Sequence, residues 1–210
     1  MVEAESPITI LTVDDHDVLR DGVAAILALE ADMKLVGEAA NGVEALQEYR
    51  RLRPDIVLLD LQMPVRNGLE TMSDILAEAP GAHIIVLTTY DGDAQAVRAL
   101  KAGARGYLLK SSLRKELLPT IRTVHQGNRY VLPEVAQQIA IHSIQDPLSD
   151  REIDVLQQVA KGRSNKVIAL QMHVSEDTIK AHLRSIFSKL DVSDRTQAVT
   201  TALRRGIIIL

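Results

Sequence analysis

The chain has 210 residues, of which 46% are hydrophobic, 25% are charged and only 2% are aromatic. This length exceeds the 100 to 150 residues that are typical of one domain, so we expect two domains with aliphatic cores. The absence of cysteine excludes disulfides, thiolate metal sites and cysteine nucleophiles. No apolar run approaches the roughly 18 residues of a membrane span, and the first residues lack a secretion signal. We therefore expect a cytoplasmic protein with no membrane partner.

The net charge of −4 conceals an uneven distribution along the chain. Residues 147–210 contain ten Lys and Arg against seven Asp and Glu, whereas residues 1–146 contain fourteen against twenty-one. An acidic first part is suited to a metal cation or a basic partner, and a mildly basic second part is suited to nucleic acid.

Short apolar segments alternate with segments of helical spacing through the first part of the chain. The segments rich in Ile, Val and Leu predict strands at residues 8–14, 34–39, 56–60, 83–88 and 106–110. Five such alternations predict an α/β fold, a parallel sheet with helices on both faces. The second strand is the least apolar, which favours an edge position and the flavodoxin-like order 2-1-3-4-5.

This alternation ends after an amphipathic helix at 114–127. We expect the first domain to cover residues 1–126 and a linker with its own helix to cover 127–147, because Gly127 can end one helix and Pro133 can begin another. Residues 148–210 then form an all-α domain, with predicted helices at about 150–160, 165–172, 175–190 and 195–205.

Acidic and polar residues stand where the predicted strands end: Asp14, Asp15, Asp60, Thr88 and Lys110. In a parallel α/β sheet these ends meet at one edge, beside the point where the strand order reverses. Crowded carboxylates favour a hard divalent cation such as Mg²⁺, and a carboxylate can act as a nucleophile toward a phosphoryl group. One aspartate at a strand end is more often a turn or cap residue, but five matching positions indicate phosphoryl transfer.

Residues 8 to about 126 resemble a receiver domain of two-component signalling. The resemblance rests on "VDDHDVLRDG", "DIVLLDLQMPVRNGLE", "VLTTY" and "KAGARGYLLK", which fall in the family's order and spacing. It implies that Asp60 is the phosphoacceptor. It also implies an Mg²⁺ site formed by Asp15, Asp60 and the backbone carbonyl of Gln62, with Asp14 contributing through water.

The same resemblance implies that Thr88 and Lys110 contact the phosphoryl group and that Tyr107 moves between exposed and buried positions with Thr88. Tyr107 can equally be an ordinary core residue. Gln62 and Tyr90 lie two residues beyond Asp60 and Thr88, where side chains could screen an attacking water. "KSS" follows the lysine where many receivers have a proline, so the shape of this loop differs from theirs.

Residues 164–190 contain two predicted helices around a turn at 172–175, and Ser175 can cap the second. At 100° per residue, one narrow face of the second helix is apolar, and the opposite face carries Lys180, Ala181 and Arg184. Periodicity alone leaves two readings open. The outer face is either simply solvated, or it reads bases in the DNA major groove.

Residues 148–199, from "LSDREIDVLQQ" to "SDRTQAV", resemble the LuxR-type helix-turn-helix. The resemblance implies that Lys180, Ala181 and Arg184 read bases. It also implies that six residues contact the DNA backbone: Ser164, Asn165, Lys166, Thr178, His182 and Lys189. Val167 departs from the family pattern, which usually has a glutamate there.

The last predicted helix has a face of small and apolar residues that includes Ala198, Val199 and Ala202. Ordinary packing is one use of such a face and close approach in a homodimer is another, and the resemblance favours a homodimer on double-stranded DNA. Two-fold symmetry then requires inverted half-sites.

Together the two parts resemble a response regulator of the NarL/FixJ family. This implies phosphotransfer from a sensor histidine kinase to Asp60, domain rearrangement and dimeric binding to promoter DNA, with no enzymatic activity beyond the receiver's own phosphorylation and dephosphorylation. A haloacid dehalogenase-type phosphohydrolase would need an aspartate at Gln62. A LuxR-type small-molecule sensor fits the acidic strand ends less well, and a never-phosphorylated scaffold does not explain the complete set of site residues.

Overall fold

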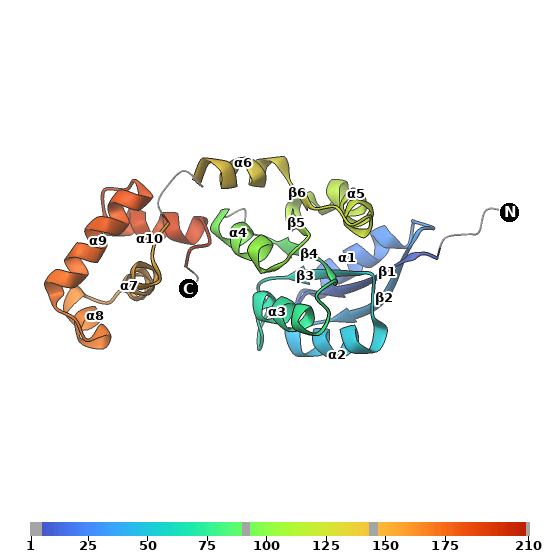
Figure 1. Ribbon diagram of the computed structural model, residues 1–210, viewed down its shortest axis with the longest axis horizontal. Coiled ribbons are helices and arrows are strands. Elements are labelled where there is room, and N and C mark those ends of the chain that lie inside the picture. Colours follow the sequence, from blue (N-terminus) through green and yellow to red (C-terminus); the bar gives the residue numbers. More distant parts are fainter. Residues whose placement is uncertain (1–5, 90–92, 143–146, 209–210) are drawn as a thin grey trace. The chain divides into compact units, whose positions relative to one another are not determined.

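The computed structural model describes residues 6–89, 93–142 and 147–208. The chain folds into two compact units, the first formed by residues 6–89 and 97–132 and the second mostly by residues 133–208. Figure 1 shows a sheet with helices in the first unit and helices alone in the second. No helix in these described ranges is long and apolar enough to cross a membrane.

The sheet of the first unit has six strands in the order β2-β1-β3-β4-β5-β6, and every neighbouring pair is parallel. The strands are β1 (Ile8–Val13), β2 (Met33–Ala39), β3 (Ile56–Asp60), β4 (His83–Thr88), β5 (Gly106–Leu109) and β6 (Tyr130–Val131). The predicted α/β class and the order 2-1-3-4-5 are confirmed. The strands β3 and β4 are almost wholly buried, as expected of strands covered on both faces.

The strand β6 was not predicted from the sequence. Residues 130–131 fall within the stretch interpreted as a linker, yet they pair with β5 through Gly106 and Tyr107. The reason is that two residues are too few to show an alternating pattern, so only the tertiary pairing reveals the strand.

Helices cover both faces of this sheet, with α2 and α3 side by side on one of them (Figure 1). They are α1 (Asp17–Leu27), α2 (Gly42–Leu52), α3 (Gly68–Glu78), α4 (Asp93–Ala102) and α5 (Leu113–His125), with a short 3₁₀ turn η1 (Lys110–Ser112) before α5. Asn41 caps α2 and Asn67 caps α3 through their side-chain oxygens, which satisfy backbone N–H groups at each helix start.

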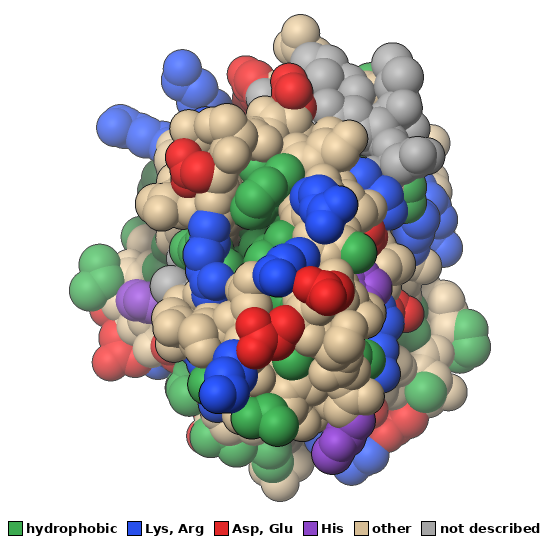
Figure 2. Space-filling model, turned by 90° about the vertical axis from the view of Figure 1, so that its left-hand side faces the viewer, with side chains coloured by type: hydrophobic (Ala, Val, Ile, Leu, Met, Phe, Trp, Pro, Cys, Tyr) green, Lys and Arg blue, Asp and Glu red, His purple; other side chains and the backbone are tan. Residues whose placement is uncertain are grey.

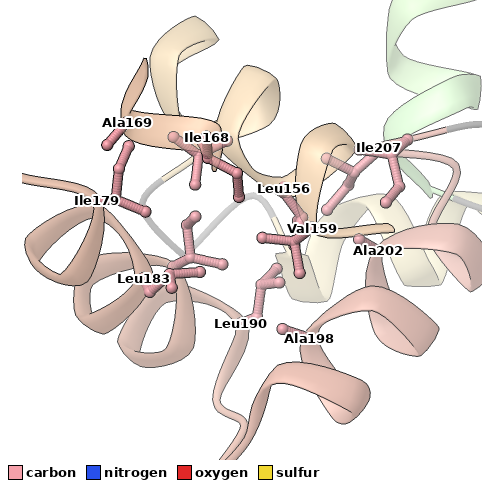
Figure 3. Close-up of a cluster of buried hydrophobic side chains, with 13 residues drawn as sticks. Leu156, Val159, Ile168, Ala169, Ile179, Leu183, Leu190, Ala198, Ala202 and Ile207 are labelled. Carbon is pink, nitrogen blue, oxygen red and sulfur yellow. The ribbon is translucent and has the colours of Figure 1, made fainter. Parts of the chain in front are cut away.

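The second unit contains α6 (Pro133–His142), α7 (Asp150–Ala160), α8 (Asn165–Met172), α9 (Glu176–Leu190) and α10 (Arg195–Arg204). The four helices predicted after residue 148 are confirmed, as is the cap by Ser175, whose side chain accepts a hydrogen bond from the Thr178 N–H. The predicted apolar face of α9 is buried in the common core of α7 to α10 (Figure 3).

The predicted dimer face on α10 is wrong for two of its three residues. Ala198 and Ala202 have no exposed surface and lie in the core of their own unit (Figure 3). Val199 is half-buried and packs against the same core. Their small side chains let α10 approach α7 and α9, so ordinary packing, the other use considered, accounts for them.

A buried carboxylate ties α7 to α9 in this unit. Glu152 is 4% exposed, and its Oε2 accepts hydrogen bonds from Ser149 N (2.7 Å) and Lys189 Nζ (2.9 Å). Ser149 also caps α7, which completes a capping box. Burial favours the neutral acid, but hydrogen bonds from Ser185, Lys189 and Ser149 outweigh it and lower the pKa of Glu152 to about 2.

We expect Glu152→Gln to lower the free energy of unfolding of the second unit by about 3 kcal/mol at neutral pH. Because the folded pKa lies below the unfolded value, wild type has this contribution in full above about pH 4.3 and loses it as the pH falls to about 2. Urea unfolding followed by circular dichroism measures it. Asp154→Asn, on the exposed side of α7, is the control. Equal losses in both variants would contradict the assigned role.

Candidate functional site

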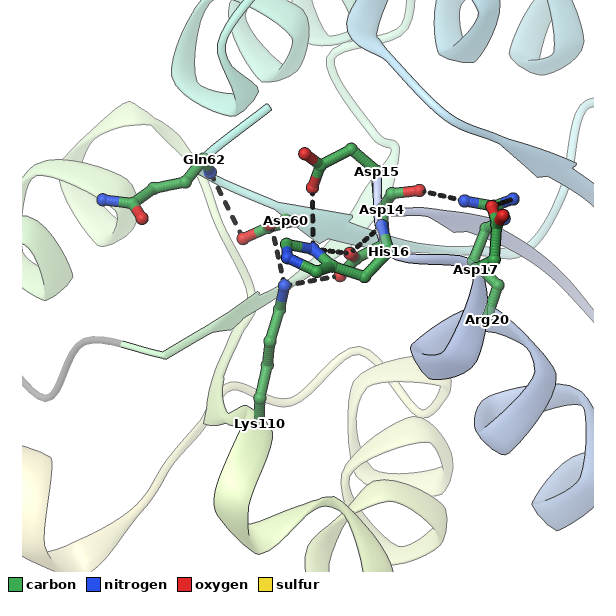
Figure 4. A network of polar contacts seen from close by, with 8 residues as sticks. All are labelled: Asp14, Asp15, His16, Asp17, Arg20, Asp60, Gln62 and Lys110. Carbon is green, nitrogen blue, oxygen red and sulfur yellow. Dashed lines mark hydrogen bonds and ion pairs between the residues drawn. The ribbon is translucent and has the colours of Figure 1, made fainter. Parts of the chain in front are cut away.

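An ammonium group bridges two buried carboxylates at the carboxyl edge of the sheet. Asp60 ends β3 and Asp14 follows β1, and their exposed fractions are 2% and 0%. Lys110, in the turn after β5, places its Nζ 2.7 Å from Asp14 Oδ2 and 2.8 Å from Asp60 Oδ2 (Figure 4). The strand order β1-β3-β4-β5 thus brings Lys110 to Asp60, which lies 50 positions earlier in the chain.

His16 belongs to the same cluster, although it was not predicted from the sequence. Its Nδ1 lies 2.9 Å from Asp15 Oδ1 and 3.1 Å from Asp14 Oδ1, and its backbone N–H donates to Asp14 Oδ1 (Figure 4). Arg20 supports this loop by donating to the Asp14 carbonyl oxygen at 2.6 Å. The run "DDHD" was the available signal in the sequence, because it places a histidine directly beside the two aspartates Asp14 and Asp15.

The backbone after β3 holds the Asp60 carboxylate in place. The Gln62 N–H donates to Asp60 Oδ1 at 3.2 Å, while the Gln62 side chain points away from the carboxylates (Figure 4). A Cβ added at Gly68 would lie 2.1 Å from the Asp60 carbonyl oxygen, so only glycine allows α3 to begin this close to β3.

Thr88 and Tyr107 are fully buried on the neighbouring strands β4 and β5. In the register of these strands Thr88 pairs with Leu109, next to Lys110, and Tyr107 pairs with Val86. Thr88 therefore ends β4 at the same edge as Lys110. The buried Tyr107 is compatible both with a core residue and with one position of a switch, and Tyr90 lies outside the described residues.

Burial governs the electrostatics of this cluster. Burial, together with the nearby Asp14 carboxylate, raises the pKa of Asp60, although Lys110 opposes the shift. Burial also disfavours the charged form of Lys110, but Asp14 and Asp60 outweigh it and raise the pKa of that ammonium. Lys110 is therefore a fixed positive charge at neutral pH, suited to hold an anionic group beside Asp60.

The donor set fits Mg²⁺. Asp14, Asp15, His16 and Asp60 each offer a ligand atom, and these atoms lie within 4.8 Å of one another. Within the described ranges they form the sole such group of three or more acidic or histidine residues. Three of the four ligands are carboxylate oxygens, which Mg²⁺ prefers over nitrogen.

The outward face of α9 carries the residues predicted to read bases. Lys180, Ala181 and Arg184 are exposed, and Thr178 and His182 are half-buried beside them. Figure 2 shows Lys and Arg side chains interspersed with Asp and Glu on this side of the second unit. The face is thus of mixed charge rather than uniformly basic.

Two of the predicted DNA-backbone contacts already have partners within the unit. Lys189 is bound to Glu152 and to the Pro147 carbonyl oxygen, and its side chain is 26% exposed. Asn165 Oδ1 accepts from Arg195 at 3.3 Å. Ser164 and Lys166, at the start of α8, are exposed. Lys189 therefore stabilises the helical unit through these contacts, and its amino group would have to leave Glu152 to reach a DNA phosphate.

Comparisons with known proteins match both units. A family model of the response regulator receiver domain matches residues 10–122, and a model of the luxR family of bacterial regulatory proteins matches residues 146–202. The chain is a response regulator of the LuxR family. It is 37% identical to the transcriptional regulatory protein LnrK of Bacillus subtilis (strain 168), over 96% of this chain and 99% of LnrK.

Solved structures agree with this assignment. The response regulator ChrA of a heme-sensing two-component system is 36% identical and has a TM-score of 0.57, with 97% of this chain and 100% of ChrA covered. RcsB of Salmonella enterica serovar Typhimurium, solved on promoter DNA, shares the fold with a TM-score of 0.76 at 23% identity, over 96% and 100% of the two chains. The response regulator is thus a transcription regulator of two domains rather than a phosphohydrolase.

Proposed function

We propose that this response regulator accepts a phosphoryl group on Asp60 from a sensor histidine kinase, and that phosphorylation promotes dimeric binding to promoter DNA. The observation that carries the proposal is the ammonium of Lys110, held 2.8 Å from Asp60 Oδ2 at the buried edge of the sheet. A carboxylate beside a fixed cation and a group of oxygen ligands is suited to phosphoryl transfer, which depends mainly on positioning and charge neutralisation.

In the proposed reaction a carboxylate oxygen of Asp60 attacks the phosphorus of a phosphohistidine. The new P–O bond forms as the P–N bond breaks, and the imidazole leaves with its electron pair. Lys110 holds one phosphoryl oxygen and the Thr88 hydroxyl holds another. Asp15, Asp60 and the Gln62 carbonyl would hold Mg²⁺, with Asp14 through water, and bound Mg²⁺ neutralises charge on the phosphoryl oxygens.

The response to phosphorylation is assigned to Thr88 and Tyr107. When the Thr88 hydroxyl is drawn toward the phosphoryl group, it leaves a space beside the adjacent strand β5. The side chain of Tyr107, which is fully buried on β5, then moves in response. Because β6 pairs with β5, we place the end of the receiver domain at residue 132 instead of 126, and the linker at residues 133–147, before a DNA-binding domain at 148–210. Phosphorylation can shift the equilibrium between two domain arrangements only by the difference between its free energies of interaction with them.

DNA binding is assigned to α8 and α9 of a cytoplasmic homodimer. Lys180, Ala181 and Arg184 read bases, and the exposed Ser164 and Lys166, with Thr178 and His182, contact the backbone. The dimer places two α9 helices on inverted half-sites. Because Ala198 and Ala202 are buried, its surface uses other residues of the chain.

The test is incubation of the full-length protein with Mg²⁺ and acetyl phosphate, followed by intact mass spectrometry. We expect one added phosphoryl group that hydroxylamine removes, as it does from acyl phosphates, and little addition when EDTA replaces Mg²⁺. The same treatment should strengthen binding to an inverted-repeat duplex selected from a randomised library. An unmodified mass under all conditions would favour a receiver that is never phosphorylated.

A further inference from the structure

The outward face of α9 carries an acidic residue for which the proposed base contacts give no role. Asp177 lies in the first turn of α9 with its side chain 87% exposed, and its Oδ1 accepts a hydrogen bond from Lys180 Nζ at 2.9 Å. At 100° per residue it lies within about 60° of Lys180 and about 20° of Arg184 around the helix axis. Asp177 therefore stands in the middle of the proposed reading face.

The neighbouring Glu176 shows what the helix dipole alone explains. Both acids lie in the first turn of α9, where negative charge stabilises the helix, and both are exposed. Glu176 lies about 100° from Asp177 and about 40° beyond Lys180, outside the arc of the helix surface that Lys180, Arg184 and Ala181 span. The dipole accounts for an acid in this turn but not for a carboxylate on the reading face, where it repels phosphates.

A carboxylate on this face has a defined preference among the bases. Hydrogen bonding to Lys180 lowers the pKa of Asp177, so at neutral pH its carboxylate only accepts hydrogen bonds. The donors of the major groove are cytosine N4 and adenine N6, and adenine places the acceptor N7 beside its donor. Cytosine faces guanine, whose O6 and N7 accept from lysine, so one C·G pair offers partners to a carboxylate and an ammonium together.

We propose that Asp177 is a specificity-determining residue of this regulator, whose carboxylate accepts a hydrogen bond from a cytosine N4 while Lys180, held beside it, donates to the adjacent guanine. The inference rests on the proposed DNA-binding function of α9. It gives Asp177 two effects: it favours one base pair in each half-site, and it weakens binding to all duplexes that lack that pair. Both effects increase discrimination between sites.

The experiment compares wild type, Asp177→Ala and Glu176→Ala, all full-length and treated with Mg²⁺ and acetyl phosphate. Each protein selects from a randomised duplex library. Its affinity is then measured for the wild-type-selected duplex, for versions with each base pair replaced, and for a shuffled duplex. Glu176→Ala is the matched control, since it removes the same charge from the same turn of the helix.

We expect Asp177→Ala to lose discrimination at one C·G pair in each half-site by about 5- to 150-fold, and to keep it at the other positions. Glu176→Ala should keep discrimination at every position. Both variants should bind the shuffled duplex slightly more tightly, because each removes one negative charge.

Two other results are distinguishable. If Asp177→Ala selects the same sequence as wild type and binds all duplexes more tightly, as Glu176→Ala does, Asp177 acts only through its charge and the inference is overturned. If wild type enriches no sequence, the proposed DNA-binding function fails and the inference fails with it.

Discussion

Asp60→Asn should take up no phosphoryl group from acetyl phosphate under conditions in which wild type takes up one. The asparagine amide keeps the shape of the side chain but lacks the nucleophilic carboxylate that phosphoryl transfer requires. The same variant should be more stable than wild type at neutral pH when Mg²⁺ is absent. Burial and Asp14 raise the pKa of Asp60, so its ionisation above the usual carboxyl pKa favours the unfolded chain.

Intact mass measures the first effect, and urea unfolding in EDTA measures the second. Asp17→Asn is the matched control, because Asp17 follows the cluster directly, is 83% exposed and pairs with Arg20 instead. We expect Asp17→Asn to be phosphorylated like wild type. Equal phosphorylation of Asp60→Asn would place the acceptor elsewhere, and a loss of stability in EDTA would mean that Lys110 outweighs the burial of Asp60.

The sequence predicted those features that depend on local pattern. Strands buried on both faces are continuous apolar runs, so they could be recognised in the sequence. The carboxyl ends of parallel strands meet at one edge, so Asp14, Asp60 and Lys110 could be predicted to lie close together. The structure adds that Lys110 contacts both carboxylates directly. It also adds His16, whose contribution depends on a side-chain direction that spacing does not determine.

The features that the sequence missed or assigned wrongly depend on tertiary contacts. Ala198 and Ala202 form a small-residue stripe, and such a stripe looks the same whether it packs inside one unit or between two copies. Lys189 lies near the predicted DNA-facing side of α9, but its pairing with Glu152 depends on how α7 crosses α9. Helical periodicity gives the face of a residue and not its partner.

Lys110→Met should lower the free energy of unfolding of the receiver by about 3 to 5 kcal/mol in EDTA, because it leaves the carboxylates of Asp14 and Asp60 buried without a cation. Tyrosine fluorescence during urea unfolding follows the receiver, since the sequence contains no tryptophan and no tyrosine after Tyr130. Lys115→Met, an exposed lysine of α5, is the control and should change stability by less than about 0.5 kcal/mol.

Two further measurements separate charge compensation from packing in Lys110→Met. Millimolar Mg²⁺ should restore part of the lost stability, because a dication bound by the same carboxylates replaces the missing ammonium. The double variant Asp60→Asn/Lys110→Met should be more stable than Lys110→Met alone, since one uncompensated carboxylate is removed. If neither Mg²⁺ nor the double substitution recovers stability, the methylene chain of Lys110 matters through packing and its ammonium does not balance the cluster.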